Sequence, residues 1–341
     1  MSAAAGFHEQ PSTGAVARAW DRFWFRPTPL FWLGLTRVVM VGFALYMMYD
    51  LRFLVRLRDT VELPAPAFDP LPLYEVLTFG GARLGQTTVV VLFWATVLAG
   101  ATALVGLFTR ISLLAFAVLF TVLQTYLYSF DEFHHPETIV VIALGALALS
   151  PAGRALSVDA WRRFGPHGFA DAARRRSPLA GWPLKLIWVF FSLAYFSAGL
   201  TKLLNSTDWL NGWTLQFHVG RDGFLHDEAA ADWIASHHGA ALLLSYGAVA
   251  FELLFWTTLL RPKLLRLFVP AGAALHIGIL LIQHAPFLSF VAGYVALLPF
   301  LVSGTHEPAP APGGRAGSTR ARADDDLSRP PADASERVSP A

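Results

Sequence analysis

The chain has no cysteine among its 341 residues, which excludes disulfides, thiolate nucleophiles and cysteine metal sites. Charged residues are scarce at 15%, and a net charge of +2 is too small to indicate nucleic-acid binding. No phosphate-binding loop, Ser-His-Asp arrangement or zinc-ligand spacing stands out, and no metal site is expected. Residues 1–29 lack the apolar region and cleavage site of a signal peptide, so we expect the first span to act as an uncleaved anchor.

Apolar residues, in contrast, make up 55% of the chain, and its 11 Trp and 27 Phe suit the interfacial belts of a membrane protein. This composition predicts an all-α, polytopic transmembrane bundle, since a straight span needs roughly 17–25 apolar residues. We expect about eight spans, of which the fourth and eighth are short. They are residues 30–49, 88–108, 111–130, 136–150, 183–204, 239–260, 266–283 and 287–302.

Lys and Arg concentrate in residues 151–182 and 261–265 and in both terminal segments. The positive-inside rule then predicts cytoplasmic termini, an even number of spans and location in the cell (inner) membrane. Residues 50–87, with four arginines, are the exception to this pattern. Together with residues 205–238, they are long enough to form lids or short surface helices over the outer face.

The domain organisation follows from these patterns. Residues 1–29 form a cytoplasmic segment, in which residues 16–25 are either a short helix on the membrane surface or a frayed terminus. Residues 30–302 form the transmembrane domain. Residues 303–341 are rich in proline and acidic residues and contain few apolar ones, so we expect a disordered cytoplasmic tail.

Lys202 is the most informative ionisable residue, because it ends the fifth apolar run at the expected outer face. A lysine at the edge of lipid needs a partner, a cavity or a function, although it can also snorkel to the interface. His134 and His135 precede the fourth span and His284 ends the seventh, so all three are expected at the same depth as Lys202. The histidine pair is either a proton relay or an ordinary polar helix start.

Arg37, Glu252 and His276 fall near the middle of the first, sixth and seventh spans. By sign and depth, Arg37 and Glu252 are the expected structural ion pair. His276 is expected to be a neutral, hydrogen-bonded core histidine. Lys185, at the inner end of the fifth span, is expected to snorkel.

The segment around Lys202 resembles the base-bearing segment of the vitamin K-dependent gamma-carboxylase and its bacterial relatives, the HTTM (horizontally transferred transmembrane) family. The residues at the family's spacing are Tyr195, Phe196, Ala198, Gly199, Lys202, Trp209 and Gly212. The stretch from His134-His135 to Ser157-Val158-Asp159, and Arg37 after Pro29-Leu30, also fit the pattern. The resemblance covers roughly residues 20–302.

The resemblance implies that Lys202 is the base that deprotonates a reduced quinone, with His135, or else His134, supporting it. Tyr195, Trp209 and His284 are the expected quinone-binding residues. A lysine desolvated by apolar neighbours loses affinity for its proton and can act as a base. The sequence contains no counterpart of the carboxylase's large extramembrane domain or of its cysteines, so the expectation is limited to the quinone-facing membrane core.

Three functions remain open from the sequence. The first is a membrane enzyme acting on a quinol or another lipidic substrate at the outer face. The second is a non-catalytic membrane partner or scaffold whose buried charges are structural, and the third, weaker reading is transport through the bundle. The expected partners are the lipid bilayer and the lipidic substrate, and not nucleic acid.

Overall fold

The computed structural model describes residues 14–50, 52–130, 137–205, 207–226, 228–285 and 287–303. Its helices are α1 Ala15–Trp24, α2 Leu30–Asp50, α3 Phe53–Glu62, η1 Ala65–Ala67, α4 Pro72–Thr78, α5 Gln86–Val105, α6 Thr109–Tyr128, α7 Glu137–Ala148, η2 Ala152–Arg154, α8 Val158–Arg174, α9 Pro178–Asn205, α10 Thr207–Leu210, α11 Trp213–His226, α12 Ala229–Ser236, α13 His238–Leu254, α14 Thr257–Leu260, η3 Pro262–Leu264, α15 Leu265–Gln283, α16 Leu288–Gly293, η4 Tyr294–Leu297 and α17 Leu298–Ser303. Two short strands, β1 Thr28–Pro29 and β2 Arg176–Ser177, pair antiparallel.

The expected all-α transmembrane bundle is confirmed, with fewer long spans than the sequence predicts. Within the described ranges, five helices are long and apolar enough to cross a membrane, or up to seven if two bent helix pairs each count as one span. The fourth predicted span is only α7, which turns by 70° into the following segment. The eighth is a shorter apolar stretch, residues 288–302, built from α16, η4 and α17.

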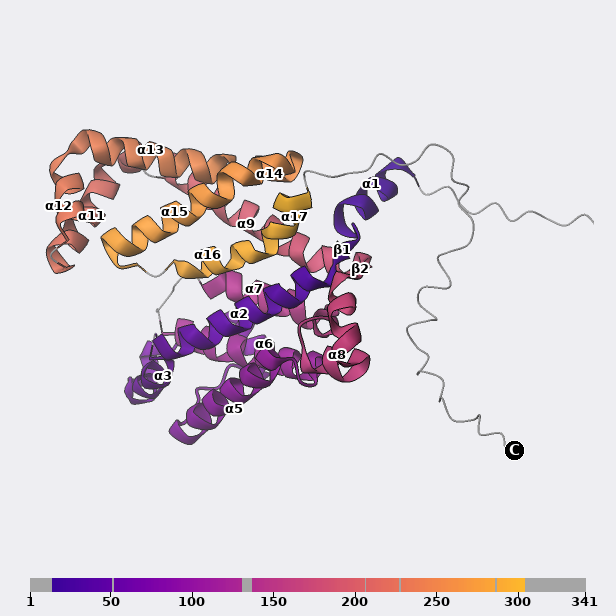
Figure 1. The fold of residues 1–341 in the computed structure, drawn as a ribbon. Helices are drawn as coiled ribbons and strands as arrows, with labels where there is room; N and C mark the ends of the chain where they lie inside the picture. Colours follow the sequence, from indigo (N-terminus) through magenta and orange to yellow (C-terminus); the bar gives the residue numbers. More distant parts are fainter. Residues whose placement is uncertain are drawn as a thin grey trace, which may run out of the picture. The chain divides into compact units, whose positions relative to one another are not determined.

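Helix α9 is the central element of the bundle. It contacts α7 and α2 on one side and α13 on the other (Figure 1). Trp188 and Phe191 of α9 are fully buried, in the same apolar core as Leu33 of α2 and Leu144 of α7. This burial explains why α7 can be short, because its neighbours are protein rather than lipid.

Both long connections assigned to the outer face contain the expected short helices. Residues 50–87 hold α3 and α4, and residues 205–238 hold α10, α11 and α12. α11 and α12 pack on each other and on α13 around a small separate apolar cluster. The predicted N-terminal helix is also present as α1, with all its residues exposed or half-buried. The predicted tail lies outside the described residues.

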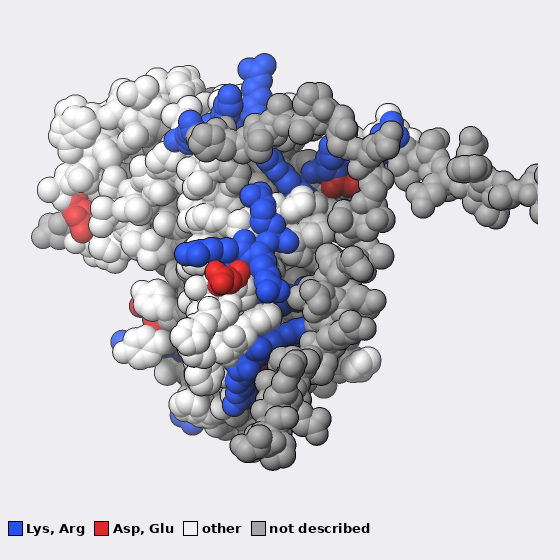
Figure 2. Space-filling view, turned by 45° about the vertical axis from the view of Figure 1, so that its right-hand side comes forward, with Lys and Arg blue, Asp and Glu red and all other residues white. Residues whose placement is uncertain are grey.

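Basic residues concentrate at one end of the bundle, around α8 and the start of α9. Figure 2 shows Lys and Arg side chains gathered in a band on the side where α8 lies, with few acidic groups among them. The arginines of α8 and of the connections beside it are Arg154, Arg162, Arg163, Arg174, Arg175 and Arg176. This is the pattern that the positive-inside rule uses.

The tight turn from α5 to α6 is fixed by residues from the α8 segment. Gly106 adopts a left-handed conformation with φ of 73°, and an added Cβ would lie 2.3 Å from Cβ of Ser157. The Asp159 carboxylate accepts hydrogen bonds from the Phe108 amide at 3.0 Å and from the Thr109 amide and hydroxyl at 2.6 and 2.7 Å. Burial acts to raise the pKa of Asp159, but these hydrogen bonds outweigh it and lower the pKa below its usual value.

We expect Asp159→Ala to lower the free energy of unfolding by about 1–2 kcal/mol, because it removes the acceptor that caps the start of α6. The measurement is thermal unfolding in detergent at neutral pH. Asp171→Ala is the matched control on the same helix, since Asp171 makes only an exposed ion pair with Arg174 at 3.7 Å. Equal shifts for the two variants would contradict the capping role.

Candidate functional site

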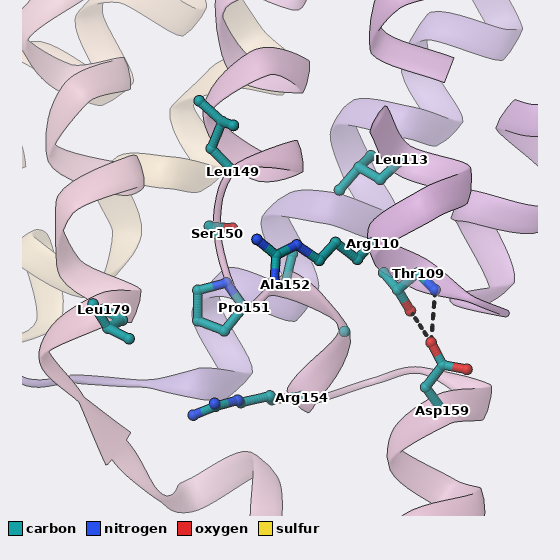
Figure 3. Close-up of a pocket in the computed structure, with 11 residues that line it drawn as sticks. Thr109, Arg110, Leu113, Leu149, Ser150, Pro151, Ala152, Arg154, Asp159 and Leu179 are labelled. Carbon is teal, nitrogen blue, oxygen red and sulfur yellow. Dashed lines mark hydrogen bonds between the residues drawn. The ribbon is translucent and has the colours of Figure 1, made fainter. Parts of the chain in front are cut away.

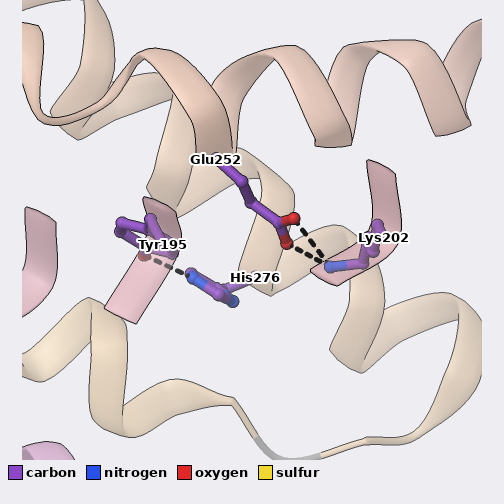
Figure 4. Close-up of polar contacts among 4 residues, drawn as sticks. All are labelled: Tyr195, Lys202, Glu252 and His276. Atoms are coloured by element: carbon purple, nitrogen blue, oxygen red, sulfur yellow. Dashed lines mark hydrogen bonds and ion pairs between the residues drawn. The ribbon is translucent and has the colours of Figure 1, made fainter. Parts of the chain in front are cut away.

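Lys202, near the end of α9, forms an ion pair with Glu252 of α13. Its Nζ lies 2.5 Å from Oε1 and 2.7 Å from Oε2, so one ammonium donates to both oxygens (Figure 4). The two side chains are only 19% and 12% exposed. The pair is therefore largely hidden from solvent but not sealed.

Several residues that carry the family resemblance lie around this ion pair and bring its two helices together. Gly199 precedes Lys202 by one turn, and an added Cβ would lie 3.0 Å from Cβ of Glu252, so α9 and α13 approach closely there. Gly212 has φ of 81°, and an added Cβ would lie 2.9 Å from Cα of Leu242 on α13. The ring of Trp209 lies 5.0 Å from the Lys202 amine, which places the cation on an aromatic face.

A chain of three buried polar side chains lies next to the pair. The Tyr195 hydroxyl, two turns before Lys202 on α9, lies 2.7 Å from Nε2 of His276 and 2.6 Å from the hydroxyl of Tyr294. All three residues are at most 4% exposed. His276 is thus the hydrogen-bonded core histidine that the sequence predicted, and Figure 4 shows it between Tyr195 and the ion pair.

The second ring nitrogen of His276, Nδ1, is buried and has no hydrogen-bond partner among the residues that the structure describes. Phe290 stacks on the ring at 4.8 Å and Phe287 at 5.8 Å. A buried polar atom without a partner is uncommon, and its explanations include a bound ligand, ion or water. The polar chain also includes Tyr294, which the sequence analysis missed. The sequence feature that could have indicated Tyr294 is a polar tyrosine hydroxyl within a short apolar run that also contains small residues.

The Arg37–Glu252 pair expected from the sequence is wrong. Glu252 pairs with Lys202, whereas the fully buried Arg37 donates to three backbone carbonyls. They are those of Ala103, Leu104 and Leu156. The last carbonyls of a helix have no partner within it, and the end of α5 offers them to the guanidinium. The two residues share a depth but belong to different neighbourhoods.

The apolar surroundings expected for the Lys202 amine also need correction, because its first neighbour is the Glu252 carboxylate. Lys185, expected to snorkel, is instead only 8% exposed. Its amine lies among the rings of Phe23, Trp188 and Phe300, at 4.7, 4.0 and 4.3 Å. This aromatic cage holds the charge within the bundle.

The other predicted site residues have different outcomes. His134 and His135 lie outside the described residues, so their place beside Lys202 stays a prediction. His284 ends α15, is exposed, and has its Nε2 3.1 Å from Oε1 of Glu228. Its ring also lies 4.0 Å from that of His226. Its contacts thus join it to α11 and α12 rather than to the Lys202–Glu252 pair.

Comparison with known proteins gives a single finding. The family model described as HTTM domain matches residues 25–298. A search of curated proteins and a search of solved structures found no match. The matched range contains α2 to η4, with Lys202, Glu252 and the Tyr195–His276–Tyr294 chain. This chain is a multi-pass membrane protein that belongs to the HTTM domain family.

Proposed function

We propose that this protein is a membrane enzyme that uses the Lys202–Glu252 pair as an acid–base unit on a lipidic substrate with an acidic hydroxyl group, such as a quinol. The observation that carries the proposal is the pair itself, 19% and 12% exposed at the end of an apolar span. Ionisable groups within membrane helices are costly, and their usual explanation is functional.

The geometry favours a division of roles between the two side chains. The Glu252 carboxylate is the available proton acceptor, because the ammonium of Lys202 has no free lone pair. When an Oε atom of Glu252 takes a proton from a substrate hydroxyl, the carboxylate loses its charge and its hold on Lys202. The ammonium then remains beside the substrate oxygen and stabilises the negative charge that develops there.

Several features of the site fit a quinol head group. Trp209 offers an aromatic face beside Lys202, and flat rings stack favourably on such faces. His276 Nδ1, which has no partner among the described residues, provides a buried hydrogen-bonding atom between Tyr195 and the ion pair. A bound quinol supplies acidic hydroxyls and two-electron chemistry with oxygen. The protein residues contribute binding, proton transfer and exclusion of water.

We further propose a location in the cell membrane, with both termini cytoplasmic and the pair near the outer face. The support is the distance between charges along α9, which begins beside the basic band around α8 and reaches Lys202 24 residues later. At 1.5 Å per residue this is roughly 36 Å, enough to cross the hydrocarbon core.

A non-catalytic role is the second candidate, and one observation favours it. Lys202 and Glu252 satisfy each other through two hydrogen bonds and join α9 to α13. Buried ion pairs of this kind can serve to fix helix packing and register. In that case, substitution of either residue would alter the stability of the protein or the recovery of a partner and would not change any turnover.

The test is quinol turnover by purified protein in nanodiscs containing reduced menaquinone under oxygen, followed by absorbance and mass spectrometry of the extracted quinone. We expect wild-type protein to consume the quinol faster than empty nanodiscs, and Glu252→Gln to lose at least about a hundredfold in rate, as for a general base. Lys263→Gln, at an exposed lysine of η3 that is not part of the pair, is the control and should match wild type. Equal rates for protein and empty nanodiscs would overturn the proposal.

A further inference from the structure

A cleft of about 380 Å³ lies at the basic end of the bundle, far along α9 from the Lys202–Glu252 pair. It is formed where the start of α6, the connection from α7 to α8, and the start of α9 meet, and we call it the basic cleft. Its lining residues are Thr109, Arg110, Leu113, Leu149, Ser150, Pro151, Ala152, Gly153, Arg154, Asp159 and Leu179.

The basic cleft contains two cations that have no partner in the described part of the chain. The side chains of Arg110 and Arg154 make no hydrogen bond or ion pair with any described residue, and both are exposed. Figure 3 shows their guanidiniums on either side of Pro151, both extended toward Leu179. Two guanidiniums that share one cleft repel each other unless an anion lies between them.

The acidic residue in the cleft does not neutralise them. Both oxygens of Asp159 accept hydrogen bonds from the start of α6, as Figure 3 shows for Thr109. Its charge is therefore already used in capping that helix. The cleft therefore keeps an excess of positive charge. Its two guanidinium groups are planar and carry several N–H donors each, a geometry that suits phosphate.

The remaining wall of the cleft is apolar and faces outward. Leu149 is 73% exposed and Leu179 is 47% exposed, while Leu113 forms the buried floor. Exposed leucines on a membrane protein are suited to contact with acyl chains rather than water. The basic cleft thus combines two guanidinium groups with an apolar wall, at the end of the bundle where anionic lipid is expected.

We infer that the basic cleft binds the phosphate group of an anionic glycerophospholipid, held by Arg110 and Arg154 with its acyl chains along Leu149 and Leu179. Free phosphate shares the same headgroup chemistry but would make no use of the apolar wall. The inference is independent of the proposed enzymatic function, because it uses none of the residues around Lys202.

The test is native mass spectrometry of detergent-purified protein with equimolar phosphatidylglycerol and phosphatidylcholine. We expect wild-type protein to retain phosphatidylglycerol preferentially, and Arg110→Gln/Arg154→Gln to lose that preference by about tenfold or more. The charge-matched control is Arg174→Gln/Lys263→Gln, which removes two exposed cations outside the cleft and should keep the preference. Leu179→Asp, which keeps both arginines, should lose it.

Thermal unfolding of each variant checks that the bundle is intact, and the exposed positions of all substituted residues favour this. A parallel arm adds millimolar inorganic phosphate. Two results together would assign the cleft to soluble phosphate and overturn the lipid inference. They are that wild-type protein retains phosphatidylglycerol and phosphatidylcholine equally, and that inorganic phosphate displaces phosphatidylglycerol. Equal losses in the cleft and control double variants would also overturn it, since they would show attraction to overall charge alone.

Discussion

Replacing Lys202 by methionine should lower the free energy of unfolding by about 2–4 kcal/mol, because it leaves the Glu252 carboxylate largely buried and without a cation. The two side chains are 19% and 12% exposed, so water can relieve only part of this cost. Glu252→Leu should destabilise the bundle by a similar amount for the reciprocal reason. The measurement is thermal or denaturant unfolding of the variants in the same detergent.

The double variant Lys202→Met/Glu252→Leu completes the cycle. It removes both charges and fills their place with apolar side chains, so we expect it to recover most of the stability lost by either single variant. A double variant as unstable as the sum of the single variants would show that the two residues do not interact energetically. That result would contradict the ion pair.

Arg37→Lys should destabilise the bundle by about 3 kcal/mol, although lysine keeps the positive charge. The guanidinium donates to carbonyls at the end of α5 and to Leu156 before α8, so it joins segments far apart in sequence. A single ammonium cannot donate to all of these acceptors in the same geometry, and unpaired buried carbonyls are costly. Circular dichroism melting in detergent measures the change.

The matched control for this substitution is Arg58→Lys on α3, where the arginine is exposed. It should change the free energy of unfolding by no more than about 0.5 kcal/mol. If Arg37→Lys lowered the free energy of unfolding no more than Arg58→Lys, the contacts of Arg37 with the backbone carbonyls would not stabilise the bundle as we expect.

The helical bundle could be predicted from the sequence because apolar runs report directly on helices in lipid. The limit appears at α7, which reads as a span but is only 12 residues long. Its apolar residues reflect burial against α6 and α9 rather than contact with lipid. Periodicity alone does not separate these two environments, since both exclude water.

The site was predicted in part, for a related reason. Lys202 and the glycines around it follow from a local motif, whereas their partner Glu252 lies 50 residues away on α13. Depth along a span can be read from sequence, but the position of a helix around the bundle cannot. Arg37 and Glu252 were therefore paired by depth although α2 and α13 belong to opposite sides of α9. The contact of Tyr195 with Tyr294 was missed on the same account.

The acid–base role of the Lys202–Glu252 pair is best tested by quinol turnover of the double variant Lys202→Met/Glu252→Leu in menaquinol nanodiscs, measured alongside its free energy of unfolding. We expect a folded protein whose turnover falls to that of empty nanodiscs, because the proton acceptor and its neighbouring cation are both gone. A stable double variant that consumes quinol at the wild-type rate would contradict an acid–base role for this pair.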